Sequence, residues 1–136
     1  MVENVGPKDT WQALLRDKDA RLVDVRTDAE WNFVGLPDLN ETGQDPVLIP
    51  WQNYPTMQPN AGFLDDLKRA GLTPENKLYF LCRSGARSTA AAELATRAGF
   101  PHSYNIADGF EGPPDADGHR GAAAGWKADG LPWRQR

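Results

Sequence analysis

Residues 77–97 read KLYFLCRSGARSTAAAELATR and contain the only cysteine of the 136-residue chain, Cys82. The run KLYFLC is apolar on both faces, which is typical of a central parallel strand. The run STAAAELATR consists mostly of helix formers, and Gly99 and Pro101 follow it where a helix would end. The stretch therefore predicts a buried strand that leads through a short loop into a helix, with the thiol at the turn.

The rest of the chain repeats this alternation of strands and helices. Apolar spacing and turn residues predict helices at 7–15, 27–35 and 60–72, strands at 21–25, 46–51 and 102–110, and a last short helix ending near residue 130. Such an order indicates an α/β fold with a mainly parallel central sheet and helices on both faces. The length fits a single domain over residues 1–136.

Two segments lack a regular pattern. Residues 36–60 are rich in Pro, Asn, Gln and Gly and predict a long irregular segment, in which Trp51, Tyr54 and Met57 are candidates for the wall of a pocket. Residues 112–125 predict a surface loop, from which His119 and Arg120 would reach solvent, a partner or the site. The run PDADGH in this loop lacks the first and last ligands of a calcium loop, so we expect no calcium site.

Composition excludes several classes of function. The net charge is −4, from 15 Lys and Arg against 19 Asp and Glu, and no basic block is present. We therefore expect neither nucleic acid nor a membrane as a partner. One cysteine and two histidines do not make a structural zinc set, so we expect no metal and no cofactor. The first residues do not form a secretory signal, and the simplest compartment is the reducing cytoplasm.

The loop after Cys82 favours reactive chemistry at the thiol. If a helix begins near Ser88, the backbone N–H groups of residues 83–88 surround the sulfur at a helix N-terminus, which acts as about half a positive charge. Arg83 and Arg87 add charge, and Gly85 lets the loop turn its N–H groups inward. These features favour the thiolate, although a lone cysteine at a strand end can also be a small buried hydrophobe.

Five short runs of the sequence together resemble the single-domain rhodaneses. These proteins are sulfurtransferases that carry sulfur as a cysteine persulfide. The resemblance covers most of the chain and rests on LVDVR at 22–26, AEW at 29–31, CRSGARS at 82–88, YNIADGF at 104–110 and GWKADGLPW at 125–133. It implies that Cys82 is the nucleophile. It also implies that the persulfide lies in an anion-binding loop made of Arg83, Ser84, Gly85, Ala86, Arg87 and Ser88.

The same resemblance implies a supporting framework made of Asp24, Arg26 and Glu30. In this interpretation Arg26 pairs with Glu30, and Asp24 supports the cysteine loop. An exposed strand end with surface charge pairs is the alternative from the residues alone. Residues 32–46, NFVGLPDLNETGQDP, depart from the family pattern, so the path of the segment that follows is not inherited from it.

The predicted activity is transfer of a sulfane sulfur from thiosulfate or another persulfide donor, small molecule or protein, to cyanide or a thiol. A cysteine phosphatase of the related dual-specificity type is an alternative. Such a loop has five residues between Cys and Arg, whereas four separate Cys82 from Arg87 here. A non-catalytic rhodanese-like binding module is the third possibility, and such modules typically lack the cysteine.

Overall fold

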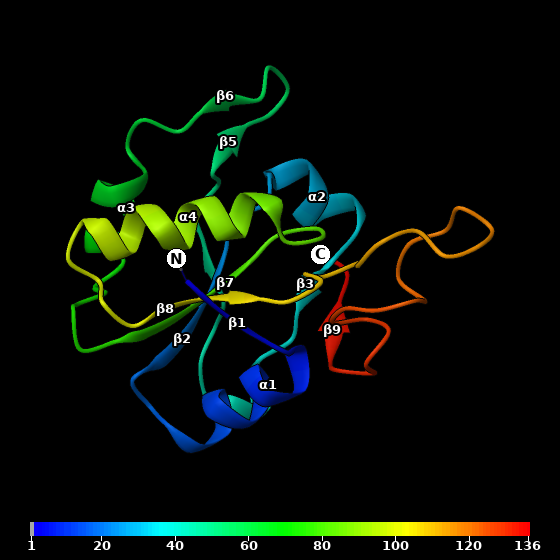
Figure 1. The fold of residues 1–136 in the computed structure, drawn as a ribbon, viewed down its shortest axis with the longest axis horizontal. Helices are drawn as coiled ribbons and strands as arrows, with labels where there is room; N and C mark the ends of the chain where they lie inside the picture. The colour runs from blue at the N-terminus through cyan, green and yellow to red at the C-terminus, as the bar shows by residue number, and fades with distance from the viewer. Residues whose placement is uncertain (1) are drawn as a thin grey trace.

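A computed structural model describes residues 2–136 and contains a five-stranded parallel sheet in the order β1-β8-β7-β2-β4 (Figure 1). The α/β fold with a central parallel sheet is therefore confirmed. The elements are β1 Glu3–Val5, α1 Pro7–Arg16, β2 Ala20–Asp24, α2 Asp28–Phe33, β3 Leu36–Pro37, the 3-10 helix η1 Asn40–Thr42, β4 Val47–Leu48, β5 Gln52–Asn53, β6 Gln58–Pro59, α3 Phe63–Arg69, β7 Lys77–Leu81, α4 Ala86–Arg97, β8 Ser103–Ile106 and β9 Trp133–Arg134.

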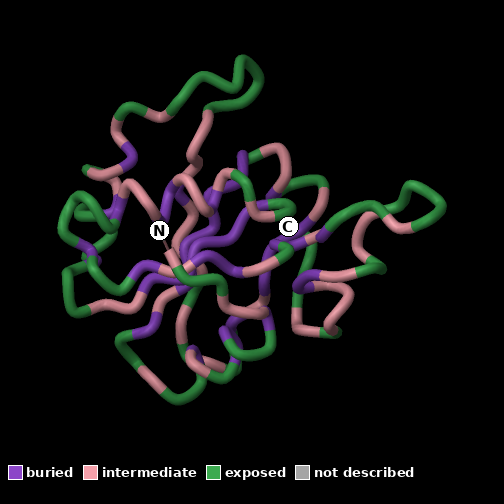
Figure 2. Tube along the Cα trace, viewed as in Figure 1, coloured by how far each residue is buried: buried purple, intermediate pink, exposed green. Residues whose placement is uncertain are grey.

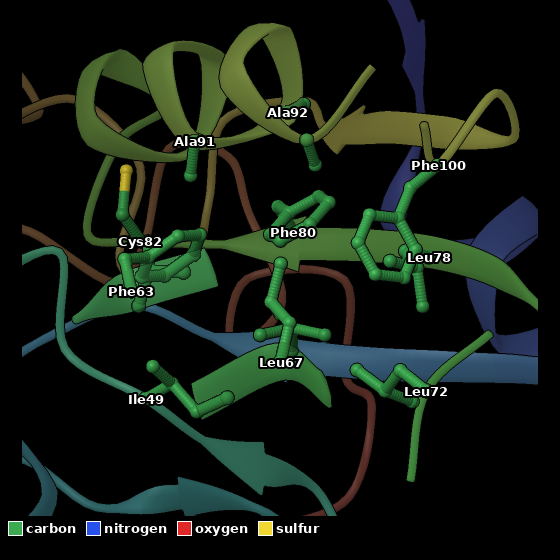
Figure 3. Close-up of a cluster of buried hydrophobic side chains, with 13 residues drawn as sticks. Ile49, Phe63, Leu67, Leu72, Leu78, Phe80, Cys82, Ala91, Ala92 and Phe100 are labelled. Carbon is green, nitrogen blue, oxygen red and sulfur yellow. The ribbon is translucent and has the colours of Figure 1, made fainter. Parts of the chain in front are cut away.

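The sheet separates two apolar cores, because residues of β7 alternate between its faces. Leu78 and Phe80 face a cluster that includes Phe63 of α3 and Ala91 of α4 (Figure 3). The intervening residues of β7 belong to the opposite cluster, which also contains Trp11 and Leu14 of α1 and, from the last part of the chain, Phe110 and Trp126. Both faces of the central strand are thus buried, as its continuous apolar sequence predicts. The purple strands in the middle of Figure 2 show this burial.

The local signals for two helices agree with the structure. Thr27 caps α2, and its side chain and that of Glu30 form the two hydrogen bonds of a capping box, as the sequence predicts. Helix α4 begins at Ala86, two residues before the predicted start. Gly85 precedes it with a φ of 123°, which an L side chain rarely adopts.

Three features of the chain ends and the middle were not predicted. The short strand β1 pairs with β8 at the sheet edge, and β9 pairs antiparallel with β3. Strands β5 and β6 form a separate hairpin that extends from the body of the molecule (Figure 1). Residues 112–125, by contrast, form turns and bends on the surface as the sequence predicts, and they are seen as the exposed arm in Figure 2.

The predicted last helix, ending near Gly130, is wrong. Residues 126–130 form turns rather than a helix. Gly125 has a φ of 104°, and an added Cβ there would lie 2.9 Å from the backbone oxygen of Gly109, so this part of the tail packs backbone to backbone. The indole of Trp126 then donates to the carbonyl of Pro132 at 2.7 Å and holds the turn closed. Within residues 2–136, no helix is long and apolar enough to cross a bilayer.

Candidate active site

Cys82 directly follows β7 at its carboxyl end, and its sulfur lies beside the first turn of α4. The residue is 1% exposed. Its Sγ accepts a hydrogen bond from the N–H of Gly85 at 3.1 Å and lies 3.1 Å from the hydroxyl of Ser88. Figure 3 shows the sulfur directed toward α4 rather than into the apolar cluster below it. The thiol therefore faces the positive end of a helix of 12 residues, where an anionic sulfur is stabilised.

A second segment supports the loop from behind. The N–H of Phe110 donates to the carbonyl of Cys82 at 2.8 Å, and the N–H groups of Glu111 and Gly112 donate to the carbonyl of Arg83. The approach is so close that a Cβ added to Gly109 would lie 2.4 Å from the Cys82 carbonyl oxygen. This role of residues 109–112 was not predicted, although the run ADGF contains the glycine that signals a close backbone approach.

Ser88 joins the sulfur to a chain of polar groups that runs from the buried loop to the exposed Asn4. Its hydroxyl lies 2.5 Å from Oδ1 of Asn105 and 3.1 Å from the carbonyl of Gly85. The other end of the Asn105 amide donates to Oδ1 of Asn4 at 2.9 Å. Parallel pairing of β1 with β8 sets Asn4 opposite Asn105, which explains why the two side chains meet. Neither asparagine was singled out as a functional residue from the sequence.

Asp24 and Arg26 lie beside the loop, and the predicted pairing of Arg26 with Glu30 is wrong. Both side chains are fully buried and pair with each other, with Nη2 of Arg26 at 2.7 Å from Oδ2 of Asp24. The same Nη2 donates to the carbonyl of Gly35 at 2.8 Å, and the guanidinium lies 4.3 Å from the ring centroid of Phe110. Asp24 is two residues before Arg26, and in an extended chain side chains two residues apart lie on the same side. Asp24 is therefore placed beside Arg26, and Glu30 is not its partner.

Glu30 instead holds Arg87 in a two-point ion pair. Nη1 and Nη2 of Arg87 donate to the two carboxylate oxygens of Glu30 at 2.7 and 2.9 Å. Burial alone would raise the pKa of Glu30, but the hydrogen bonds and charge of Arg87 outweigh it and hold that pKa below its ordinary value. The hydrogen bonds from Glu30 likewise raise the pKa of Arg87. The pair ties the start of α4 to α2.

A depression of about 400 Å³, which we call the mouth, opens beside this ion pair. It is lined by Glu30, Val34, Met57, Arg83, Arg87 and Glu111. Of the three aromatic and apolar candidates in the irregular segment, Met57 reaches the mouth. Trp51 packs edge-on against Phe63, with ring centroids 5.1 Å apart, and Tyr54 borders a different hollow near Trp31.

The remaining sequence candidates take structural positions. Arg120 donates to the carbonyl of Gly112 at 2.7 Å, and the carbonyl of His119 accepts from the N–H of Asp115, so both close the surface loop on itself. In the part of the chain that the structure describes, no three His, Cys, Asp or Glu side chains are grouped to hold a metal ion. Ser84 and Ala86 are exposed on the outer side of the cysteine loop.

Comparison with known proteins defines the class. The chain is similar to the solved structure of Rv0390 from M. tuberculosis, with 46% identity, a TM-score of 0.89 and coverage of 99% of this chain and 98% of that one. It shares its fold with the polysulfide-sulfur transferase homodimer of Wolinella succinogenes, at 24% identity and a TM-score of 0.67, over 99% of this chain and 80% of that one. It is also 32% identical to the chloroplastic rhodanese-like domain-containing protein 4 of Arabidopsis thaliana, over 93% of this chain and 24% of the plant protein.

These similarities and the parallel sheet define a protein with a rhodanese-like fold. Residues 3–136 match the family described as STR4 middle domain, and the chain belongs to that family.

Proposed function

We propose that the protein is a sulfurtransferase that carries a sulfane sulfur on Cys82. The observation that supports this most directly is the position of the sulfur, which meets the Gly85 N–H and the Ser88 hydroxyl at the start of α4. In the first half-reaction the Cys82 thiolate attacks the outer sulfur of thiosulfate or of another persulfide. A new S–S bond forms, the old one breaks, and sulfite or a thiolate leaves with the bonding electrons. Donors of this kind agree with the polysulfide-sulfur transfer that the name of the Wolinella neighbour states.

The second half-reaction discharges the persulfide. An acceptor thiolate or cyanide attacks the outer sulfur, and Cys82 leaves as the thiolate that begins the next cycle. The backbone N–H groups at the start of α4 stabilise the negative sulfur in both halves, so the loop of residues 83–88 works as an anion cradle. The acceptor is a small thiol or a protein thiol, and a reducing compartment such as the cytoplasm would keep Cys82 available for it.

The two arginines of the loop take different roles in this proposal. Arg87 is committed to Glu30 by both of its terminal nitrogens, so its charge is already neutralised. Arg83 is exposed and lines the mouth beside Arg87. In this proposal an anionic donor approaches the loop through the mouth and meets Arg83 there. We therefore assign contact with an anionic donor to Arg83, and the shape of the loop to Arg87.

The geometry does not favour a phosphatase. A phosphatase loop needs its arginine free to hold phosphate oxygens over the cysteine, but Arg87 binds Glu30 instead. The loop also has one residue fewer between Cys82 and Arg87 than that chemistry uses. A non-catalytic module does not need a thiol held at a helix N-terminus. A thiol held at the start of a helix therefore supports the sulfurtransferase proposal over the other two.

An intact mass measurement tests the proposal. The reduced protein is treated with thiosulfate or with inorganic polysulfide, desalted and weighed. We expect one added sulfur atom per chain, lost again on addition of cyanide with formation of thiocyanate. Cys82→Ser is the matched control and should gain no mass, because a hydroxyl is a far poorer nucleophile. A parent protein that gains no sulfur from either donor, or a Cys82→Ser variant that still turns over, would overturn the proposal.

A further inference from the structure

The hydroxyl of Ser88 has a single proton and more than one group to give it to. Three acceptors lie within hydrogen-bonding distance: the Asn105 Oδ1, the Gly85 carbonyl and the Cys82 sulfur, with Asn105 the nearest. Ser88 is fully buried and Asn105 is 5% exposed, so water cannot easily supply missing partners. The direction of each hydrogen bond is therefore set by the neighbouring protein groups.

The orientation of the Asn105 amide decides which way the Ser88 hydroxyl points. In the structure the Asn105 Nδ2 donates to Asn4, so its Oδ1 faces Ser88 and can only accept. Ser88 then gives its proton to Asn105, and its oxygen is left to accept the S–H of Cys82. This arrangement stabilises the protonated thiol, which is the unreactive form.

A half-turn of both asparagine amides reverses the direction of every bond in the chain. The 2.5 Å between the Ser88 hydroxyl and Asn105 is an O–H···O distance, so in the reversed arrangement, where an Asn105 N–H donates, these two groups move apart to at least about 2.7 Å. Asn4 then donates to Asn105, and Asn105 donates to the Ser88 oxygen. The Ser88 proton is left with two acceptors, the sulfur and the Gly85 carbonyl, each 3.1 Å away, and the charge of a thiolate makes the sulfur the stronger of the two. That arrangement stabilises the thiolate or the inner sulfur of a persulfide. The thiol proton itself leaves to solvent and does not travel along the chain.

We propose that Asn105 is a positioning residue that acts through Ser88, and that Asn4 holds its orientation from the edge of the sheet. The pair selects whether the Ser88 hydroxyl supports the thiol or the thiolate of Cys82. This inference deepens the proposed function and rests on it, because the pair supports sulfur transfer only if Cys82 carries the sulfur. The hydrogen-bond selection, however, concerns the thiol alone and can be measured without a sulfur donor.

Substitution by aspartate fixes one arrangement, because a carboxylate has no N–H to donate. In Asn4→Asp the Asn105 amide must keep donating outward, and in Asn105→Asp the Ser88 hydroxyl must keep donating to the carboxylate. Both variants should hold Ser88 in the orientation that supports the thiol. Asn4 is exposed on an edge strand, so Asn4→Asp tests the inference even if the buried variant does not fold. Asn4→Ala removes the acceptor without adding charge and should not raise the alkylation midpoint.

The measurement is the pH dependence of Cys82 alkylation by iodoacetamide in the full chain. We expect Asn105→Asp to raise the midpoint by about one pH unit, which is about tenfold slower alkylation at neutral pH and matches one hydrogen bond to a charged sulfur. We expect about threefold slower alkylation for Asn4→Asp, whose effect is one bond further away. The other charged groups on the elements around the loop are the same in every variant: Asp24, Arg26, Glu30, Arg83, Arg87 and Glu111.

A Ser88→Ala background separates the relay from simple charge repulsion. If the effect passes through the hydroxyl, each aspartate variant should shift the midpoint much less when Ser88 is absent. An equal shift in both backgrounds, or no shift in the Ser88 parent, would overturn the inference. Sulfur loading by thiosulfate is measured in parallel. If the protein gains sulfur but the aspartate effects do not depend on Ser88, only the hydrogen-bond inference is overturned. If the aspartate effects depend on Ser88 but no sulfur is gained, only the sulfurtransferase proposal is overturned.

Discussion

The buried pair of Asp24 and Arg26 offers a quantitative test of what holds the site together. Both side chains are fully buried, and Arg26 also holds the Gly35 carbonyl and the face of Phe110. Arg26→Met keeps an apolar stem but leaves the Asp24 carboxylate buried without its partner. Removing one partner of a buried pair costs about 3–5 kcal/mol, and the lost contact with Phe110 adds about 0.5–2 kcal/mol. We expect a loss of about 4 kcal/mol, a large share of the roughly 5–15 kcal/mol of a typical domain.

A double-mutant cycle isolates the pair. Asp24→Asn alone should also be costly, whereas the double variant leaves no uncompensated charge and should cost less than the sum by at least about 2 kcal/mol. The free energy of unfolding is measured by urea denaturation at pH 7, followed by the fluorescence of the tryptophans. Arg69→Met is the control, because its ion pair with Asp66 is exposed and should contribute less than about 1 kcal/mol.

Two results would refute this reasoning. Additive costs within about 0.5 kcal/mol would show that Asp24 and Arg26 do not stabilise each other. A cost for Arg26→Met no larger than that of the Arg69 control would show that burial does not make the pair important. A variant that keeps its stability but loses sulfur transfer would instead assign Arg26 a direct part in the chemistry.

Three further predictions concern the loop and its mouth. Because the pKa of Glu30 is lowered in the folded protein, its ion pair stabilises the fold fully above the ordinary value of 4.5 and loses this effect as the pH falls through the folded pKa. Urea denaturation should therefore show that Glu30→Gln is less stable than the parent by about 1–3 kcal/mol at pH 7 and nearly as stable as the parent in acid. Gly109→Ala should lower the thermal midpoint strongly, because the added Cβ would clash with the Cys82 carbonyl. Gly118→Ala, which has open space around it, should lower the midpoint only through the strain of its positive φ. Arg83→Ala should reduce kcat/KM for thiosulfate about tenfold and change that for an uncharged persulfide donor little, and equal losses for both donors would contradict its role as an anion contact.

The sequence predicts the body of this fold because its central elements carry strong periodic signals. Strand β7 is apolar on both faces, and a glycine follows each of the helices α2, α3 and α4, at positions 35, 71 and 99. Strands β1 and β9 escape prediction because they have three and two residues and lie at exposed edges, where no apolar alternation is needed. The sequence predicts a short helix in the tail, ending near Gly130. Backbone packing around Gly125 outweighs that propensity.

The site is predictable where its parts are neighbours in the chain. Residues 82–88 form the loop that the spacing indicates, with the N–H of Gly85 turned to the sulfur. Partners that are far apart are not visible from the sequence, since Glu30 and Arg87 are 57 residues apart and Asn4 and Asn105 are 101 apart. Only the sheet order brings these pairs together. The Asp24–Arg26 pairing, by contrast, follows from their spacing along an extended chain.

The pairing of β1 with β8 also has a consequence for the order of events during synthesis. Residues 3–5 leave the ribosome before residues 103–106 and have no strand to pair with until those residues have followed. At about 5–20 residues per second, the edge strand and the amide of Asn4 wait several seconds for their partners. Cys82 is made before β8 as well, so its loop exists for part of that time without Asn105 and without the backing of residues 109–112. The nascent chain therefore carries the thiol before the residues that cover its loop have been made, and we expect oxidation during translation to fall mainly in this interval.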